Sequence, residues 1–425
     1  MKIHIKNGRL IDPKNNIDSK QDVFIAAGKI VGLGNAPDGF VANQTIDASN
    51  LIVCPGLVDL SARLREPGFE YKATLESELL AAAAGGVTSL ACPPDTDPVL
   101  DEPGLVEMLK HRAKLLNLVN VYPLGALTRQ LQGKNLTEMF ELSEAGCVGF
   151  SQADNALTDT QVLWNALQYA ATFNLTVWLR AEDAHLAKNG VAHSGEVAAR
   201  LGLQGIPACA ETIALSTILS LMRETGAKVH VCRLSTLQAV AMIKQAKKEG
   251  LPISCDIAST HLHLIEHDIG YFDALCHLRP PLRTERDRDA LRAGLLEGTI
   301  DAICSDHTPV DDDAKLSPFA ESEPGASGLE LLLSLTLKWA MENKLALPKA
   351  LTSITSSPAS VLGIEGGSLS LGAQADVCIF DAGNVWKVEA KALLSQGKNT
   401  PFMGLELPGK VRWTLLNGQI VYQQH

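Results

Sequence analysis

The chain has 425 residues, of which 46% are hydrophobic and 20% charged, and 37 basic against 48 acidic residues give a net charge of −11. This composition excludes disordered, collagen-like and low-complexity proteins, and the length is long for one plain domain but short for three. The acidic balance makes nucleic acid and anionic membrane surfaces poor partners. Eleven His and nine Cys would suffice for a metal site by count alone, so their positions decide whether one is expected.

The cysteines indicate a reducing compartment. Their number is odd, no CxxC pair occurs, and residues such as Cys232 and Cys255 lie in apolar, strand-like runs, which predicts buried thiols rather than disulfides. The first residues, MKIHIKNGRLID, alternate without the apolar core of a signal peptide. No uncharged apolar run approaches the ~20 residues of a membrane helix. We therefore expect a soluble, cytoplasmic protein.

Both ends of the chain are rich in predicted strands. Asn7-Gly8 and Asn417-Gly418 each separate two alternating apolar runs, which is the pattern of a β-hairpin, and Gly372–Asp381 predicts another strand. We expect residues 1–54 and 365–425 to pair into one composite β domain.

The middle of the chain alternates between short apolar runs and helical stretches. The predicted strands are Gly56–Leu60, Val87–Cys92, Val119–Gly125, Cys147–Ser151, Thr176–Arg180, Lys228–Arg233, Ile253–Ile257 and Thr299–Ser305. The predicted helices are Thr74–Ala84, Pro103–Leu116, Leu136–Ala145, Asp159–Thr172, Glu211–Thr225, Thr236–Glu249, Glu285–Leu296 and Gly328–Glu342. Eight such units over residues 55–364 predict an α/β fold, a (β/α)8 TIM barrel. A doubly wound open sheet is the second choice, but its GxGxxG loop is absent.

Charged residues follow the strands where a barrel enzyme places its chemistry. Arg63, Arg180 and Arg233 come at the ends of strands 1, 5 and 6, and Asp306 follows strand 8. Arginine stays protonated and cannot ligate a cation, and three guanidiniums near one point would repel a metal. One such arginine would be read as a surface ion pair. Three of them opposite Asp306 predict an internal charge cluster.

The histidines do not suggest a replacement metal site. His261 and His263 form an HxH pair after strand 7, which we interpret as solvent-facing or capping residues. His230 is out of register with Arg233 on its strand, so we expect it to face the outer helices. His307 is placed to hydrogen-bond near Asp306.

Several segments together resemble one known family. They are PGLVDLSARLREPG (Pro55–Gly68), AAAAGGVTSLACPPDTDPV (Ala81–Val99), RAEDAHL (Arg180–Leu186), GIPACAE (Gly205–Glu211), VHVCRLST (Val229–Thr236), PPLRTERDR (Pro280–Arg288), GTIDAICSDHTP (Gly298–Pro309), KLSPFAESEPGASGLE (Lys315–Glu330) and GSLSLGAQADVCIFD (Gly367–Asp381). The chain resembles the dihydroorotases of the amidohydrolase superfamily over nearly its whole length. The resemblance implies a TIM barrel of the metal-dependent hydrolase type plus a composite β-sandwich from both termini.

The resemblance also implies a site, and this chain departs from it. The family uses zinc to cyclise carbamoyl aspartate reversibly to dihydroorotate. Of the six metal-site positions, only the strand-8 aspartate keeps its residue, and the six fall on Ser61, Arg63, Gln152, Arg180, Arg233 and Asp306. The family's substrate-binding positions fall on Arg65, Asp95, Arg279 and Val310, of which only Arg65 keeps the expected residue. We therefore expect no bound metal, no cofactor and a vestigial Asp306 in an inactive hydrolase site, with the guanidiniums filling the metal's place.

The same pattern is similar to a subfamily of inactive dihydroorotase-like chains. That similarity implies a structural partner of the aspartate carbamoyltransferase catalytic subunit in pyrimidine biosynthesis, as a homodimer or part of a larger mixed complex. Two alternatives stay open. One is an active cyclic amidohydrolase with an unusual site, and the other is an anion-binding regulatory module whose arginines capture a carboxylate or phosphate.

Overall fold

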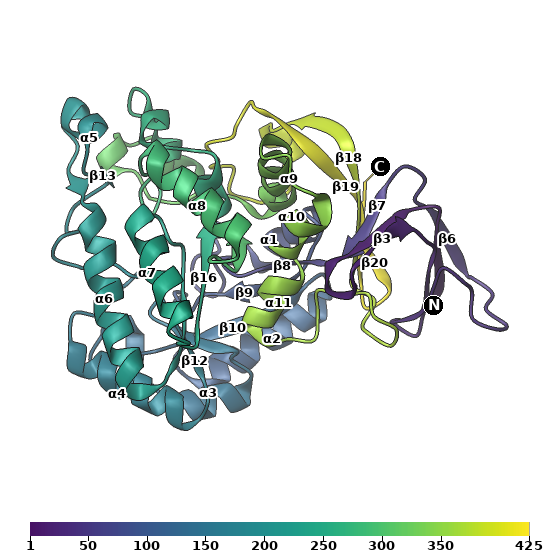
Figure 1. The fold of residues 1–425 in the computed structure, drawn as a ribbon, viewed down its shortest axis with the longest axis horizontal. Coiled ribbons are helices and arrows are strands. Elements are labelled where there is room, and N and C mark those ends of the chain that lie inside the picture. The colour runs from purple at the N-terminus through teal and green to yellow at the C-terminus, as the bar shows by residue number, and fades with distance from the viewer. Residues whose placement is uncertain (425) are drawn as a thin grey trace.

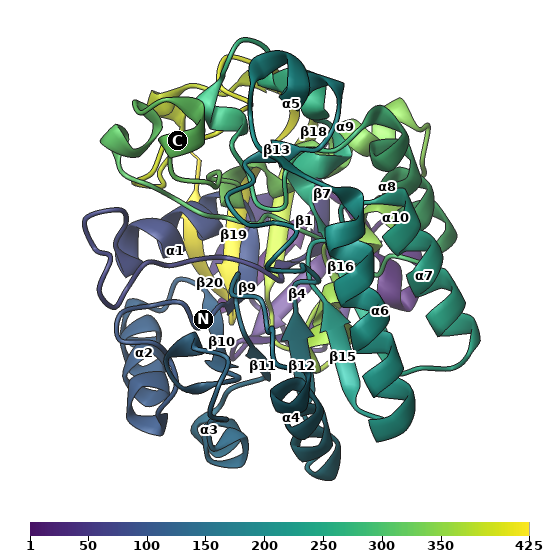
Figure 2. The same cartoon turned by 90° about the vertical axis from the view of Figure 1, so that its left-hand side faces the viewer.

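Eight parallel strands form the centre of the molecule, which we describe over residues 1–424 in a computed structural model (Figures 1 and 2). In chain order these strands are β8 (Leu57–Asp59), β9 (Val87–Cys92), β10 (Asn120–Ala126), β11 (Gly149–Ser151), β12 (Thr176–Leu179), β15 (Lys228–Val231), β16 (Ile253–Ala258) and β17 (Ala302–Cys304). Just past the ends of β8 and β17, Arg63 N donates to His307 O at 2.9 Å and His307 N donates to Ser61 O at 3.0 Å. These bonds close the sheet into a barrel, and the predicted (β/α)8 fold is confirmed.

Helices surround the barrel, as Figure 2 shows. The main ones are α1 (Leu75–Ala84), α2 (Pro103–Leu116), α3 (Met139–Ala145), α4 (Thr160–Thr172), α6 (Ala208–Thr225), α7 (Leu237–Lys248), α8 (Glu285–Glu297) and α9 (Leu332–Glu342). Shorter pieces are β13 (Ala192–His193), α5 (Glu196–Leu201), β14 (Gly205–Ile206), α10 (Leu347–Thr352) and α11 (Ser356–Leu362). Turns of 3-10 helix lie at Pro13–Asn15, Arg129–Leu131, Ser259–Leu262, Glu266–Ile269, Ala274–Cys276, Asp312–Lys315, Phe319–Glu321, Leu329–Leu331 and Ala390–Ala392. Threonine hydroxyls cap several N-termini, as in the capping boxes of α1 and α8.

The strand alternation sorts side chains between the two sides of the barrel wall. On β12, Val177 and Leu179 join the large core under the helices, whereas Trp178 belongs to a separate inner cluster with Cys304. Leu362 of α11 packs on that inner cluster from one end of the barrel. Continuing the same period of two, Arg180 is on the inner side.

The small domain consists of two sheets built from both ends of the chain. The six-stranded sheet has the order β20-β19-β18-β7-β2-β3, and the four-stranded sheet has the order β5-β4-β1-β6. The strands are β1 (Lys2–Lys6), β2 (Arg9–Asp12), β3 (Ile17–Lys20), β4 (Val23–Ala26), β5 (Lys29–Leu33), β6 (Gln44–Asp47), β7 (Ile52–Pro55), β18 (Val377–Lys387), β19 (Glu406–Leu416) and β20 (Gln419–Gln423). Their shared core joins residues from both ends, such as Ile25 and Leu415.

Of the two predicted hairpins, one is present. Asn417-Gly418 turns β19 into β20, with Leu416 opposite Gln419. The prediction for Asn7-Gly8 was wrong, because β1 and β2 belong to different sheets. Asn7 has a positive φ of 66°, and a Cβ on Gly8 would lie 2.6 Å from Val53 Cγ2, so this Asn-Gly forms a tight corner between sheets.

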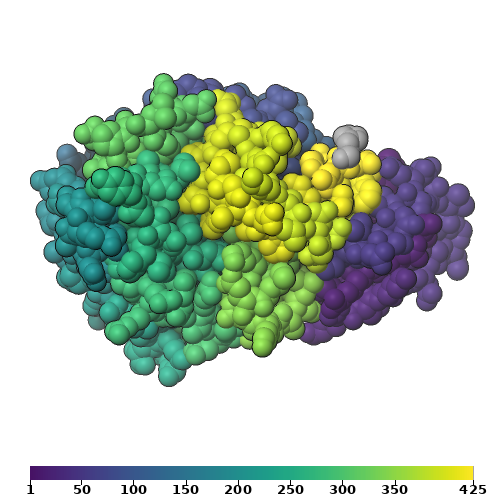
Figure 3. Space-filling model, turned by 90° about the horizontal axis from the view of Figure 1, so that it is seen from above, coloured from purple at the N-terminus to yellow at the C-terminus, as the bar shows by residue number. Residues whose placement is uncertain are grey.

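The connection between β18 and β19 leaves the small domain and lies against the barrel. Leu393 and Phe402 of this segment (residues 388–405) pack against Leu335 of α9. Figure 3 shows it in yellow beside the green loops that follow β16 and β17. Within residues 1–424, no helix is both long and apolar enough to cross a membrane.

Candidate functional site

The three strand-end arginines meet at the mouth of the barrel. Arg180 follows β12 directly, Arg233 follows β15 after a short step, and Arg63 follows β8. Arg233 has a positive φ of 54°, which interrupts the strand alternation and aims its side chain inward. Their side chains are only 4–5% exposed.

One carboxylate, Asp154, holds all three guanidiniums. Its Oδ1 accepts from Arg233 Nη2 at 2.6 Å and from Arg180 Nε at 2.8 Å, and its Oδ2 accepts from Arg63 Nη2 at 2.7 Å. Asp154 lies on the loop after β11, with its side chain 27% exposed. Because its partners come from three different strands, this residue ties β8, β12 and β15 together.

Three further carboxylates complete the cluster. Asp306 Oδ1 accepts from Arg233 Nη1 at 2.9 Å and lies 3.7 Å from Arg63 Nη1. Asp95 accepts from Arg63 Nε at 2.7 Å, and Glu182 takes both terminal nitrogens of Arg180 at 2.6 and 2.8 Å. The arginines therefore converge, but on Asp154 rather than on Asp306.

The electrostatics of the cluster are balanced internally. Burial alone would raise the pKa of Asp154, but the guanidiniums of Arg233, Arg63 and Arg180 hold it well below its ordinary value. Burial raises the pKa of Asp306 in spite of Arg233 and Arg63. Burial alone would also lower the pKa values of the three arginines. The neighbouring carboxylates outweigh it and raise these pKa values above that of a free arginine. Three guanidiniums face four carboxylates, which leaves a formal charge of about −1.

This donor set does not fit a divalent metal ion. Zinc requires imidazole, thiolate or carboxylate donors that converge on one point, and here guanidiniums project into that point. The Asp306 oxygen facing the centre is already bonded to Arg233. Across residues 1–424, no group of three or more His, Cys, Asp or Glu side chains is arranged to hold a metal.

The other predicted positions lie around the cluster. Ser61 Oγ is 3.5 Å from Asp306 Oδ1, whereas the amide of Gln152 is turned away and bonds Thr128 and the Leu131 carbonyl. Asp95 is in the cluster, as described above. Arg65 donates from Nε to Pro309 O at 2.8 Å. The backbone carbonyl oxygen of Arg279 accepts from Arg233 Nη1 at 3.4 Å. Val310 is buried, and its N–H bonds Asn399.

The structure corrects three predictions about histidines. His230 points into the barrel and not at the helices. Its Nε2 lies 3.0 Å from Asp256 Oδ2, and its ring packs at a tilt against Trp178, with 4.1 Å between ring centroids. The prediction assumed unbroken alternation up to Arg233, which the positive φ at Arg233 invalidates. His261 and His263 are not solvent-facing, because His261 is buried and the side chain of His263 is only 4% exposed. This burial lowers the pKa of each to about 4.

His307 is turned away from Asp306. Its Nε2 lies 2.6 Å from Glu78 Oε2, and its Nδ1 accepts from the Gly328 N–H at 3.1 Å. The accepting Nδ1 places the proton on Nε2, so His307 donates to Glu78. This fully buried pair fixes the loop after β17 against α1 rather than serving the cluster.

Sequence reasoning missed Asp154, the central anion of the site. It follows β11 by three residues, in FSQAD (Phe150–Asp154), and no spacing rule singles it out. A charge argument could have found it, because three buried guanidiniums need more than Asp306 to neutralise them. Acidic residues in the loops at the strand ends were the candidates to consider.

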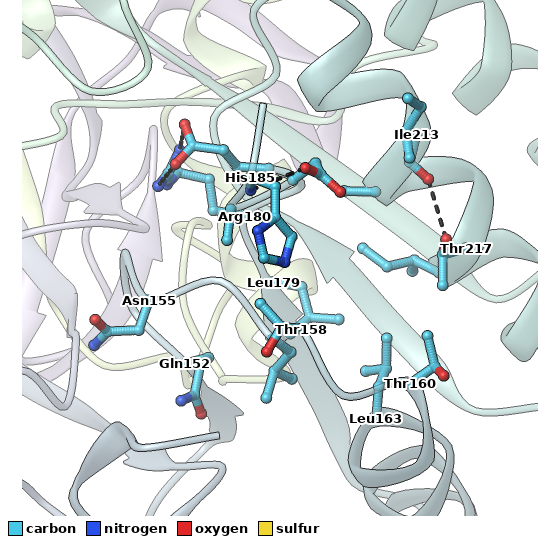
Figure 4. Close-up of a pocket in the computed structure, with 16 residues that line it drawn as sticks. Gln152, Asn155, Thr158, Thr160, Leu163, Leu179, Arg180, His185, Ile213 and Thr217 are labelled. Atoms are coloured by element: carbon cyan, nitrogen blue, oxygen red, sulfur yellow. Dashed lines mark hydrogen bonds and ion pairs between the residues drawn. The ribbon is translucent and has the colours of Figure 1, made fainter. Parts of the chain in front are cut away.

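A pocket borders the cluster on the outer side of the barrel wall (Figure 4). Arg180 and Glu182 form part of its wall, and Leu163, Leu179 and Ile218 supply apolar surface. In Figure 4 the ring of His185 lies between Arg180 and Leu179. Arg180 and Glu182, which pair with each other in the cluster, therefore also line this pocket.

Comparison with known proteins identifies the family. Residues 50–239 match the family described as Dihydro-orotase-like, and residues 335–422 match the one described as Amidohydrolase family. A dihydroorotase-like protein of Pseudomonas aeruginosa is 44% identical, and the alignment covers 100% of both chains. The chain belongs to the dihydroorotase-like proteins of the amidohydrolase superfamily.

Two further relatives of this dihydroorotase-like chain support the assignment. A dihydroorotase of Geobacter sp. (strain M21) is 40% identical over 100% of both chains. Among solved structures, the L-hydantoinase (dihydropyrimidinase) from Arthrobacter aurescens superimposes with a TM-score of 0.88, at 25% identity, over 99% of this chain and 96% of that one. The barrel and the β domain are thus both features of the superfamily fold.

Proposed function

We propose that this dihydroorotase-like chain is a catalytically inactive subunit in pyrimidine biosynthesis that assembles with the aspartate carbamoyltransferase catalytic subunit. One observation carries the loss of catalysis. Arg63, Arg180 and Arg233 stand where the family resemblance places metal-binding histidines, and Asp154 binds all three. A fixed set of protein charges occupies the region in which the family resemblance places two metal ions.

The chemistry explains why this exchange removes hydrolysis. Metal binding lowers the pKa of water to about 7, far below that of free water, which is how such enzymes generate a nucleophile at neutral pH. A guanidinium supplies positive charge but no open coordination position for water. Without a metal, no activated water is supplied for Asp306 to deprotonate. Its Oδ1 is moreover bonded to Arg233, so this oxygen is not free to accept a proton from a substrate.

The assignment of the partner rests on the resemblance to inactive dihydroorotase-like chains that hold aspartate carbamoyltransferase together. The structure is compatible with a cytoplasmic subunit, because all nine cysteines are free thiols. The anion-binding alternative is weakened by the charges, since four carboxylates already surround the three guanidiniums. The alternative of an active amidohydrolase needs a metal-binding donor set that the cluster lacks.

A dihydroorotase assay on the purified chain with added zinc tests the inactive assignment. We expect no turnover of carbamoyl aspartate or dihydroorotate above background and far less than one zinc per chain by elemental analysis. An active dihydroorotase assayed in parallel controls for substrate and zinc quality. Turnover that Asp306→Ala abolishes, or about one tightly bound zinc per chain, would overturn the proposal in favour of an active amidohydrolase.

Reconstitution tests the assembly. The purified chain is mixed with the aspartate carbamoyltransferase catalytic chain of the same organism and analysed by size-exclusion chromatography with light scattering. We expect a mixed complex, and we expect transferase activity to fall when this chain is removed. Separate elution at concentrations of tens of micromolar, with unchanged transferase activity, would contradict a structural role.

A further inference from the structure

Two loops at the mouth of the barrel pack together into a projecting lobe. We call residues 264–278, after β16, and 311–323, after β17, the mouth lobe. His277 stacks on Phe319 with 5.0 Å between ring centroids, and Gly325 N donates to His277 O at 2.9 Å. Ile269, Cys276 and Phe319 share a buried core with residues of α5. The two loops are therefore held in place by a buried core beneath their exposed surface.

The tip of this lobe is apolar and strongly exposed. Tyr271 is 91% exposed and Leu316 is 79% exposed, and Phe272 lines a surface hollow with Leu316. Phe272 has a positive φ of 65°, a strained conformation that bulky residues rarely adopt. Gly270 before Tyr271 also has a positive φ. Together they turn Tyr271 outward from the molecule.

The rim of the lobe is acidic. Its exposed carboxylates are Asp268, Asp273, Asp312, Asp313 and Glu321. Lys315 is the one lysine or arginine in the two loop segments, and its Nζ is directed to the carbonyl oxygens of His277 and Glu323. The lobe thus combines an exposed apolar tip with five exposed carboxylates that no lysine or arginine of the two loop segments neutralises.

We propose that the mouth lobe is the surface by which this chain docks on its partner, a protein face with an apolar pocket rimmed by lysine and arginine. Exposed tyrosines held on a rigid base are typical centres of binding energy, and complementary charge fixes the orientation of the partner. A second copy of this chain is the poorer occupant, because a two-fold contact would bring the same carboxylates face to face. This inference rests on the proposed function, for which the partner is the aspartate carbamoyltransferase catalytic chain.

Binding of the full chain to that transferase chain, followed by titration calorimetry, tests the surface. Tyr271→Ala should weaken binding by at least about 10-fold, and the double change Asp312→Lys with Asp313→Lys should weaken it further at low salt. Phe140→Ala is the matched control, because Phe140 is 45% exposed on α3, which lies at the opposite end of the barrel from α5 in Figure 2. Thermal melts verify that each variant is folded.

The outcomes separate the two proposals. Wild-type binding that Tyr271→Ala and the charge reversals weaken, with Phe140→Ala unaffected, supports the lobe. If the wild type binds and the lobe variants bind equally well, the mouth lobe is not the docking surface, and the proposed function still stands. No binding by the wild-type chain overturns the proposed function and the docking surface with it.

Discussion

Arg233 and Asp154 face each other across the barrel mouth, with 2.6 Å between Nη2 and Oδ1. One residue follows β15 and the other follows β11, two strands that are separated by β12. The contact therefore links two strands that are not neighbours in the sheet. The family resemblance implies bound metal ions in this region, whereas here side chains of the chain itself make the cross-link.

Asp154→Asn should destabilise the fold by about 2–4 kcal/mol, because it removes the charge that three buried guanidiniums share. Urea unfolding followed by circular dichroism measures the change. Asp95→Asn is the matched control, since Asp95 has a similar exposure but bonds only Arg63. We expect about 1–2 kcal/mol for that variant. Equal losses for the two variants would contradict the central place of Asp154.

Metal chelation should leave the stability of this chain unchanged. A ligand at 100 times its Kd stabilises a protein by about 2.7 kcal/mol, so a bound structural zinc would be obvious in a thermal melt. We expect the Tm with EDTA and with added zinc to agree within about 1 °C. A zinc-dependent dihydroorotase treated in the same way provides the positive control. A drop of several degrees on chelation would show that the guanidinium cluster does not replace a metal.

Much of the fold was predictable because its signals are local. All eight predicted strands and eight helices have counterparts in the structure, since short apolar runs and amphipathic stretches encode them directly. The Asn417-Gly418 hairpin followed from turn chemistry. Asn7-Gly8 carries the same dipeptide, yet the packing of Gly8 against Val53 separates its strands into two sheets. The Asn-Gly dipeptide sets the local bend of the chain, but tertiary contacts decide which strands pair with each other.

The site was predictable only in part, for physical reasons. The strand-end positions of Arg63, Arg180 and Arg233 followed from the barrel, and their convergence is a consequence of its closure. Asp154 was missed because a loop residue has no periodicity. The orientation of His230 was mistaken because a single positive φ, at Arg233, reverses the face of a strand end.

Stability should depend on Asp59 between pH 7 and pH 5. Burial raises its pKa to about 6 in the folded chain, above the value of about 3.9 in an unfolded one. The folded state therefore binds this proton more readily, and acidification to pH 5 should add about 1 kcal/mol of stability from this group. That contribution is lost again as the pH rises through 6.

Asp59→Asn isolates the effect, because the amide oxygen can still accept from the Ser305 N–H, which is 2.8 Å from Asp59 Oδ1. Burial raises the pKa of Asp376 to about 6 as well. Asp376 is present in both the wild type and the variant, so its contribution cancels in the difference between them. We expect the wild type to gain about 1 kcal/mol more than the variant between the two pH values in urea titrations. Parallel pH profiles would contradict the assignment.

Asn399 should control the loop that carries Asp306. Its amide donates to Thr308 O at 3.0 Å and Gly325 O at 3.1 Å, and its oxygen accepts from Val310 N at 3.0 Å. Asn399→Ala leaves these buried groups unpaired, so we expect a loss of about 2–4 kcal/mol. Hydrogen exchange at the Val310 amide should accelerate well beyond that of the barrel strands. Gln396→Ala in the same segment is the control, because its exposed side chain donates one bond, to Tyr71 O, and should change stability by less than about 0.5 kcal/mol. Unchanged exchange at Val310 in the Asn399 variant would show that the loop is held without the β18–β19 connection.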